Sequence, residues 1–155
     1  MRLRDFLFIF FISMVPVVEL RGAIPYAAVF GVDIWQAALV AVVGNLLPVP
    51  LILFGMDLLL RLFGQTKWLG PILNRFVARA EKKAQSMGNV ELLGLAIFVG
   101  IPLPGTGAWT GAMISSVLKL PRRKSIFAIF LGLIMSATIM CVISYLLPGL
   151  FAQLF

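Results

Sequence analysis

The sequence predicts an all-α integral membrane protein made of two repeats with inverted topology. Three observations lead to this prediction: an apolar composition, long uncharged segments, and two broken apolar segments that align with each other. The chain has 155 residues, of which 61% are hydrophobic and 12% are charged. Soluble domains average roughly 25% charged residues, and a chain of this length is expected to form one domain. We therefore expect a single membrane domain over residues 1–155.

The composition also excludes several classes of function. Histidine is absent, and the single Cys141 lies in an apolar run, so one chain offers neither a disulfide framework nor a cysteine metal site. No nucleophile and base can be paired from these residues, so we expect no enzyme, metal or cofactor. The net charge of +7 could suggest a nucleic-acid partner. In a membrane protein, loop cations instead set the orientation, and no nucleic acid is expected.

Two uncharged segments are long enough to cross a bilayer. A transmembrane helix needs about 20 mostly apolar residues. The segment from Ile34 to Met56 meets this requirement, as does the segment that begins at Ser125 and runs to the C-terminus. Each is predicted to form one transmembrane helix.

Two further apolar segments are interrupted near their centres. Between Leu92 and Leu118 lies a run of residues that break helices, namely Pro102, Pro104, Gly105, Thr106 and Gly107. Each arm beside this run is roughly 15 Å long, about half the hydrocarbon thickness. The segment before Asp33 is interrupted in the same way, by Glu19 and Arg21 between Pro16 and Pro25. Both segments are predicted to be re-entrant helical hairpins whose breaks face a shared site.

The two halves align at an offset of 86 residues, which places Pro16 on Pro102 and Glu19 on Gly105. Each half then contains a broken hairpin, a charged turn and a long span. A hairpin adds no crossing and a span adds one, so the halves should have opposite orientations. We assign repeat 1 to about residues 1–60 and repeat 2 to about 90–155. Between them, residues 61–89 carry apolar residues at helical spacing opposite basic ones, which predicts an interfacial amphipathic helix.

The basic residues predict the orientation in the cytoplasmic (inner) membrane, where we expect a multi-pass protein. The connector and the Arg122-Arg123-Lys124 run fall on one side if the second hairpin is re-entrant, and that side should be cytoplasmic. Asp33 would then face outward. Arg2 and Arg4 lie outside if the first segment is a hairpin, and inside if it crosses. A crossing first segment is therefore an open alternative.

Glu19 and Arg21 are the first candidates for a functional site, because ionisable residues inside a membrane are rare and usually functional. Burial disfavours a charged carboxylate and a nearby cation favours it. Glu19 could therefore bind and release a proton, or it could form a structural ion pair with Arg21. Arg21 could bind an anionic group such as a phosphate, or only neutralise Glu19.

The second break offers further candidates. A helix that begins near Gly107 would direct its amides toward an anion or a carboxylate. The spacing of Gly107 and Gly111 also permits close helix contact. Three residues could line a substrate site: Trp109, Thr110 and Asn45. Asn45, which precedes Pro48 and Pro50, could instead satisfy backbone groups freed by those prolines.

Both broken motifs resemble those of a known family. They read Pro16-Val-Val-Glu19-Leu-Arg21-Gly22-Ala-Ile-Pro25 and Pro102-Leu-Pro104-Gly105-Thr106-Gly107-Ala-Trp109-Thr110-Gly111. The chain resembles the small multi-drug export proteins of bacteria and archaea over nearly its whole length. More distantly, it is similar to the DedA/VTT membrane proteins, which pair two opposed re-entrant hairpins and are associated with proton-dependent transport or lipid scrambling. That resemblance implies that Glu19 matches their hairpin carboxylate. It fails at Gly105, Thr106 and Gly107, where DedA proteins place arginines.

These observations predict a small secondary transporter that couples the export of a small amphiphilic compound to protons. Glu19 would be the coupling carboxylate and Arg21 its partner or an anion ligand, with residues 102–107 as the opposing wall. A homodimer is expected, surrounded by membrane lipids. Two alternatives remain open: a flippase or scramblase for lipids or lipid phosphates, and a membrane scaffold that transports nothing.

Overall fold

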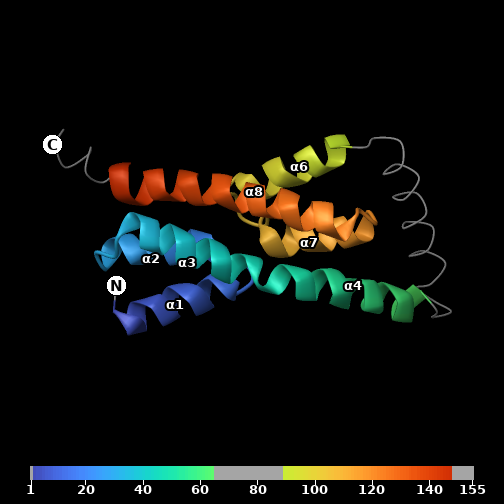
Figure 1. Cartoon of the computed structure of the whole chain (residues 1–155), viewed down its shortest axis with the longest axis horizontal. Helices are drawn as coiled ribbons and strands as arrows, with labels where there is room; N and C mark the ends of the chain where they lie inside the picture. The colour runs from blue at the N-terminus through green and yellow to red at the C-terminus, as the bar shows by residue number, and fades with distance from the viewer. Residues whose placement is uncertain (1, 65–88, 148–155) are drawn as a thin grey trace.

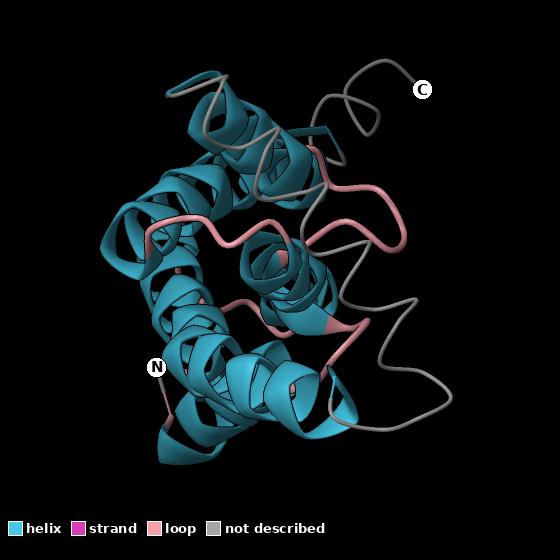
Figure 2. Ribbon diagram, turned by 90° about the vertical axis from the view of Figure 1, so that its right-hand side faces the viewer, coloured by secondary structure: helices cyan, strands magenta, loops and turns pink. Residues whose placement is uncertain are grey.

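The structure is a computed structural model, and it describes residues 2–64 and 89–147. This part of the chain is helical and contains no strand, as predicted. Its elements are α1 (Leu3–Met14), α2 (Glu19–Val29), α3 (Ile34–Leu46), α4 (Pro48–Gly64), α6 (Asn89–Gly100), α7 (Ala108–Val117), α8 (Arg122–Cys141) and the π-helical η1 (Val142–Leu146). Short loops connect most of these helices (Figure 2). The predicted amphipathic connector lies outside the described residues, except that 61–64 end α4.

Two helical hairpins enter the molecule from opposite ends. Helices α1 and α2 double back on each other, as do α6 and α7, and the two turns face each other near the middle (Figure 1). Within the first hairpin, the rings of Phe8 and Tyr26 pack with their centroids 4.1 Å apart. We call residues 15–21 the first tip and residues 101–107 the second tip.

The long helices run beside both hairpins along the molecule (Figure 1). Two stretches are long and apolar enough to cross a membrane, Ile34–Met56 and Arg122–Leu146, which confirms the two predicted spans by length and composition. The first stretch contains α3 and the start of α4, with a break at Leu47. Asp33 caps α3, because its carboxylate accepts from the Trp35 N–H at 3.0 Å.

Pro25 does not break the chain as predicted. It lies inside α2, which begins at Glu19 and continues to Val29. The fixed φ of proline is compatible with a helix, and the missing N–H removes a single hydrogen bond, to the Arg21 carbonyl. The interruption of the first segment is therefore limited to residues 15–18, between the end of α1 and the start of α2.

Each hairpin contacts a long helix through a glycine. A Cβ on Gly44 would lie 2.6 Å from the Phe10 carbonyl oxygen in α1, and a Cβ on Gly132 would lie 2.6 Å from the Ala96 carbonyl oxygen in α6. Phe10 and Ala96 are 86 residues apart in the sequence. In both places the absent side chain lets two helix backbones meet closely.

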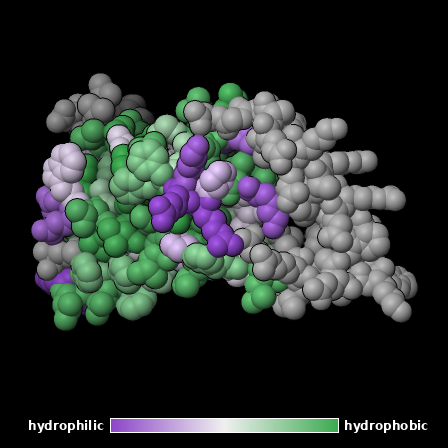
Figure 3. Space-filling model, turned by 45° about the vertical axis from the view of Figure 1, so that its right-hand side comes forward, coloured by the Kyte–Doolittle hydropathy of each residue, from purple (hydrophilic) through white to green (hydrophobic). Residues whose placement is uncertain are grey.

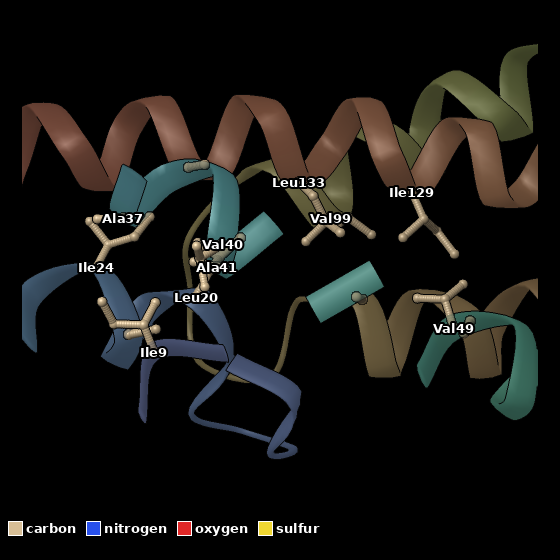
Figure 4. Packing of buried hydrophobic residues seen from close by; sticks show 14 of the residues in the cluster. Ile9, Leu20, Ile24, Ala37, Val40, Ala41, Val49, Val99, Ile129 and Leu133 are labelled. Atoms are coloured by element: carbon tan, nitrogen blue, oxygen red, sulfur yellow. The ribbon is translucent and has the colours of Figure 1, made fainter. Parts of the chain in front are cut away.

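The buried apolar side chains lie between the hairpins and the long helices (Figure 4). On the side of the first hairpin, Ile9, Leu20 and Ile24 pack toward α3. On the other side, Val99 and Leu133 bring α6 and α8 together. The two tips meet between these regions, so their positions are fixed by packing on either side.

Apolar residues also cover much of the outer surface (Figure 3). Large hydrophobic side chains are exposed on several helices, including Leu39 at 67%, Leu51 at 69% and Phe127 at 63%. Soluble monomers rarely expose contiguous apolar surface on this scale. The surface of the described helices therefore suits a lipid environment.

Candidate functional site

Arg21 connects the first tip to the backbone of the second tip. Its Nη1 donates a hydrogen bond to the Leu103 carbonyl, and its Nη2 donates to the Thr106 carbonyl. The same Nη2 also donates to Thr106 Oγ1 at 2.8 Å. Arg21 thus satisfies carbonyl oxygens that the broken backbone of the second tip leaves without helical partners.

Glu19 lies at the N-terminus of α7. The residue is 4% exposed, and its Oε1 accepts a hydrogen bond from the Trp109 N–H at 3.2 Å. The N-cap residue of α7 is Gly107, which has no side chain to accept such a bond. The carboxylate of Glu19 therefore caps α7 from 90 residues earlier in the sequence, where the helix dipole favours a negative charge.

Gly107 makes this capping contact possible. A Cβ built on Gly107 would lie 2.6 Å from the Glu19 Cδ and would overlap Oε2. Gly111, one turn further along α7, is close to Val99 of α6 in a similar way, with its Cβ 2.6 Å from Val99 Cγ2. The close helix contact that the spacing of these glycines predicted is present at Gly111, whereas Gly107 lies against a carboxylate instead.

Trp109 forms a third connection between the tips. Its indole Nε1 donates a hydrogen bond to the carbonyl of Met14, the last residue of α1, at 3.0 Å. This contact joins α7 to the first hairpin beside the bond from Glu19 to the Trp109 backbone. Thr110 follows on α7 and is half-buried. The structure thus brings Glu19, Arg21, Thr106, Gly107 and Trp109 into one region.

The backbone of both tips contains residues in the left-handed region. Glu19 has a φ of 51° and Val17 a φ of 74°, which are unfavourable for side chains with a Cβ and cost about 1–3 kcal/mol each. In the second tip, Gly105 has a φ of 82°. Gly105 follows Glu19 by the same 86 residues, so the two tips need this conformation at corresponding positions. The first tip places a carboxylate where the backbone favours glycine.

Glu19 and Arg21 do not pair with each other. Both side chains bond to the second tip, and within residues 2–64 and 89–147 no ion pair joins them. The predicted alternative of a structural ion pair between the two is therefore not what the geometry contains. Both terminal nitrogens of Arg21 donate to protein oxygens in this conformation, and its buried Nε has no hydrogen-bond partner.

Asn45 lies fully buried near the end of α3, at 0% exposure. Neither its Oδ1 nor its Nδ2 has a hydrogen-bond partner. Pro48 cannot donate to the Gly44 carbonyl, because proline has no N–H. The amide of Asn45 does not fill the structural role that the prolines suggested. That Asn45 lines a substrate site, the other role predicted for it, stays a prediction.

Replacing Asn45 with leucine should stabilise the protein while impairing its function. Leucine has the same number of side-chain heavy atoms and removes two unsatisfied polar atoms, which should raise the free energy of unfolding by about 1–3 kcal/mol. Thermal denaturation in detergent measures this change, and a flux assay on the same preparation measures function. Ser136→Ala is a matched control, because its buried hydroxyl also lacks a partner but was not predicted to line the site. A destabilised Asn45→Leu variant would show that the amide has partners after all.

A comparison with protein families identifies the chain. A family described as "Putative small multi-drug export protein" matches residues 19–139, which is well over half of the sequence. The chain belongs to the small multi-drug export protein family. This confirms the resemblance found in its two broken motifs, and together with the two long apolar helices it makes the chain a membrane protein. The matched region begins at Glu19 and includes every residue at which the two tips bond except Met14.

Searches of curated proteins and of solved structures found no significant match for this small multi-drug export protein. The likeness to DedA proteins remains a prediction.

Sequence reasoning identified the main side chains of the site but missed the carbonyls of Met14 and Leu103 as acceptors. One signal for the capping contact was present: Gly107 precedes a helix and has no capping side chain of its own.

Proposed function

We propose that this small multi-drug export protein is a secondary transporter that couples the export of a small amphiphilic compound to protons. Glu19 is its coupling carboxylate. The observation that carries this proposal is the capping contact, in which a buried carboxylate of one hairpin bonds to the α7 N-terminus of the other. The charge of the Glu19 carboxylate therefore determines how strongly the two hairpins are held together.

Protonation of Glu19 weakens that contact. A charged acceptor makes a hydrogen bond about twice as strong as a neutral one, and only the charged form is attracted by the helix dipole. A proton on Glu19 therefore favours separation of the tips, and loss of the proton favours the closed arrangement of Figure 1. Separation of the tips would open the interior of the molecule to a substrate, and we propose that the buried Asn45 contacts it.

In this proposal the hairpins are re-entrant and the halves form an inverted repeat. The hairpin helices α1, α2 and α7 have 12, 11 and 10 residues, so each is at most about 18 Å long and too short to cross. The last residues of α1 and α6, Met14 and Gly100, are 86 positions apart. The doubling back of α1 and α2 supports a re-entrant first segment over a crossing one.

The charges support one orientation. Arg122, Arg123 and Lys124 begin α8 at the end of the molecule opposite the N-terminus (Figure 1). Arg2, Arg4 and Asp33 line one pocket at the other end. Under the positive-inside rule, the end at which α8 begins is cytoplasmic, and the protein is a multi-pass protein of the inner membrane. Each protomer contributes one carboxylate to the tip contact, and we propose that two protomers form a homodimer.

The test is proton flux in proteoliposomes, comparing wild type with Glu19→Gln. Glutamine keeps the shape of the side chain and an oxygen for the Trp109 N–H, so the variant should fold and reconstitute normally. We expect flux in the wild type and flux at the level of protein-free liposomes in the variant. Glu91→Gln makes the same chemical change in the first turn of α6, outside the tip contact, and should leave flux unchanged.

The same proteoliposomes distinguish the proposed transporter from the two alternative functions. If the wild type moves no protons while both proteins are equally folded, the coupled-transporter proposal is wrong. Movement of fluorescent lipids would then indicate a flippase or scramblase, and the absence of both activities would indicate a scaffold. A lipid phosphate at Arg21 would first have to displace the bonds to Leu103 and Thr106, so the structure favours that rival less.

A further inference from the structure

We propose that a groove between α6 and α8 binds an anionic phospholipid, with the lipid headgroup at Arg123 and Lys124. This site lies on the outer face of the helices, apart from the contact between the tips, and does not depend on the proposed transport function. The groove has a volume of about 460 Å³. It would hold the headgroup and part of one acyl chain of a lipid from the cytoplasmic leaflet, while the rest of the lipid stays in the bilayer.

The groove is charged at one end and apolar along its walls. Arg123 and Lys124 come from the first turn of α8, while Phe127 and Leu131 continue along the same helix. Leu131 follows Lys124 by seven residues, which is roughly 10 Å along the helix axis. From α6, Leu93 forms part of the opposite wall. A ligand that fills this groove needs an anionic group at one end and an apolar chain toward the middle of the membrane.

Apart from their contribution to the orientation, the two cations make no contact that fixes them in the described structure. Both are exposed, and within residues 2–64 and 89–147 neither side chain has a hydrogen bond or an ion pair. Arg122 differs, because its guanidinium lies 4.5 Å from the centroid of the Phe54 ring. The helix dipole disfavours cations in the first turn of a helix, so the stability of α8 does not explain Arg123 and Lys124. Glu91 does not line the groove.

The location of the groove identifies the anion as a lipid. Phe127 is 63% exposed and Leu93 is 62% exposed, on helices of a membrane protein. Acyl chains of the surrounding bilayer therefore reach the walls directly. Basic pockets between helices on the cytoplasmic side are typical sites for anionic headgroups. A soluble anion such as phosphate could use the two cations but not the apolar walls.

The experiment is native mass spectrometry of the purified full-length protein with dioleoyl phosphatidylglycerol or dioleoyl phosphatidylcholine. We expect the wild type to retain phosphatidylglycerol preferentially. Arg123→Gln with Lys124→Gln should weaken this binding by roughly thirtyfold, since each basic residue contributes about fivefold to the attraction of an anionic lipid surface. Arg2→Gln with Arg4→Gln removes two cations from the opposite end and should leave the binding unchanged.

A third variant separates binding in the groove from attraction at the surface. Leu93→Trp narrows the groove without changing any charge, and it should weaken retention of phosphatidylglycerol. Equal retention of the two lipids by the wild type would overturn the proposal, as would unchanged binding in the double glutamine variant. If Leu93→Trp binds as the wild type does, the cations attract headgroups at the surface and the groove holds no lipid. Glu19→Gln should bind phosphatidylglycerol normally, so a failure of the transport proposal would not affect this test.

Discussion

The substitution Gly107→Ala is expected to separate the two hairpin tips and to destabilise the protein by about 3–5 kcal/mol, as when a buried charged group loses its partner. The added methyl group would overlap Oε2 of Glu19 and lie 2.6 Å from its Cδ. The carboxylate cannot stay at the α7 N-terminus beside this methyl group, and its hydrogen bond with the Trp109 N–H is lost. Thermal denaturation in detergent should show the loss, and proton flux should fall with it.

Two further variants establish the cause of that loss. Gly94 lies inside α6 with nothing within 4 Å of an added Cβ, so Gly94→Ala should stabilise the protein by about 0.5–1 kcal/mol. Adding Glu19→Ala to Gly107→Ala removes the carboxylate that the methyl group meets. The double variant should therefore be more stable than the sum of the single effects predicts. Additive effects in this cycle would show that Gly107 does not act through Glu19.

Replacing Arg21 with glutamine is expected to destabilise the protein by about 1.5–3 kcal/mol, the value of hydrogen bonds made by a charged group. The Thr106 carbonyl would lose its charged donor in a part of the backbone without helical hydrogen bonds, while the Leu103 carbonyl would keep only the bonds from the Thr106 N–H and hydroxyl. Arg21→Lys should recover only part of the loss, because one ammonium cannot take the place of two nitrogens in a fixed plane. Hydrogen exchange of the 101–107 backbone should increase in both variants, together with a lower midpoint of thermal denaturation.

The control for Arg21 is Arg2→Gln, which removes an exposed cation and should change the stability by no more than about 0.5 kcal/mol. If Arg21→Gln is as stable as this control, the bonds to the second tip do not hold the hairpins together. A cycle with Thr106→Val measures the bond to the Thr106 hydroxyl separately.

The meeting of the two tips could be predicted from the sequence because the bilayer leaves few alternatives. Broken backbone is tolerated at membrane depth only where protein or a water-filled cavity covers it, so both breaks had to face inward. The offset that aligns Pro16 with Pro102 also aligned the last residue of α1, Met14, with the last residue of α6, Gly100. The partners at the tips could not be predicted. Side chains there bond to atoms 82 to 95 residues away, and several of the acceptors are carbonyls, which every residue has.

Predictions made from the local sequence were wrong at positions where tertiary contacts determine the structure. Pro25 was predicted to end a break, yet α2 runs through it. Pro48 was expected to free backbone groups inside the predicted span, yet it is the first residue of α4, a position at which proline is favourable. For Asn45, the sequence indicated an amide that would bond to freed carbonyls, and the structure leaves both amide atoms without partners. In each case the sequence identified the residue but did not determine which neighbours would surround it.

The contact between the tips also has a consequence for how the protein is synthesised. Glu19 and Arg21 leave the ribosome long before residues 103–109, which supply their partners. At about 5–20 residues per second, the first hairpin must wait roughly 5–20 s for the second. During that interval two ionisable side chains of a nascent chain have no partner in the protein and need water, lipid headgroups or the insertion machinery around them. The closing of the tips is thus a late event of biogenesis, and a chain that stops before the second hairpin should be recognised by quality-control proteases of the membrane.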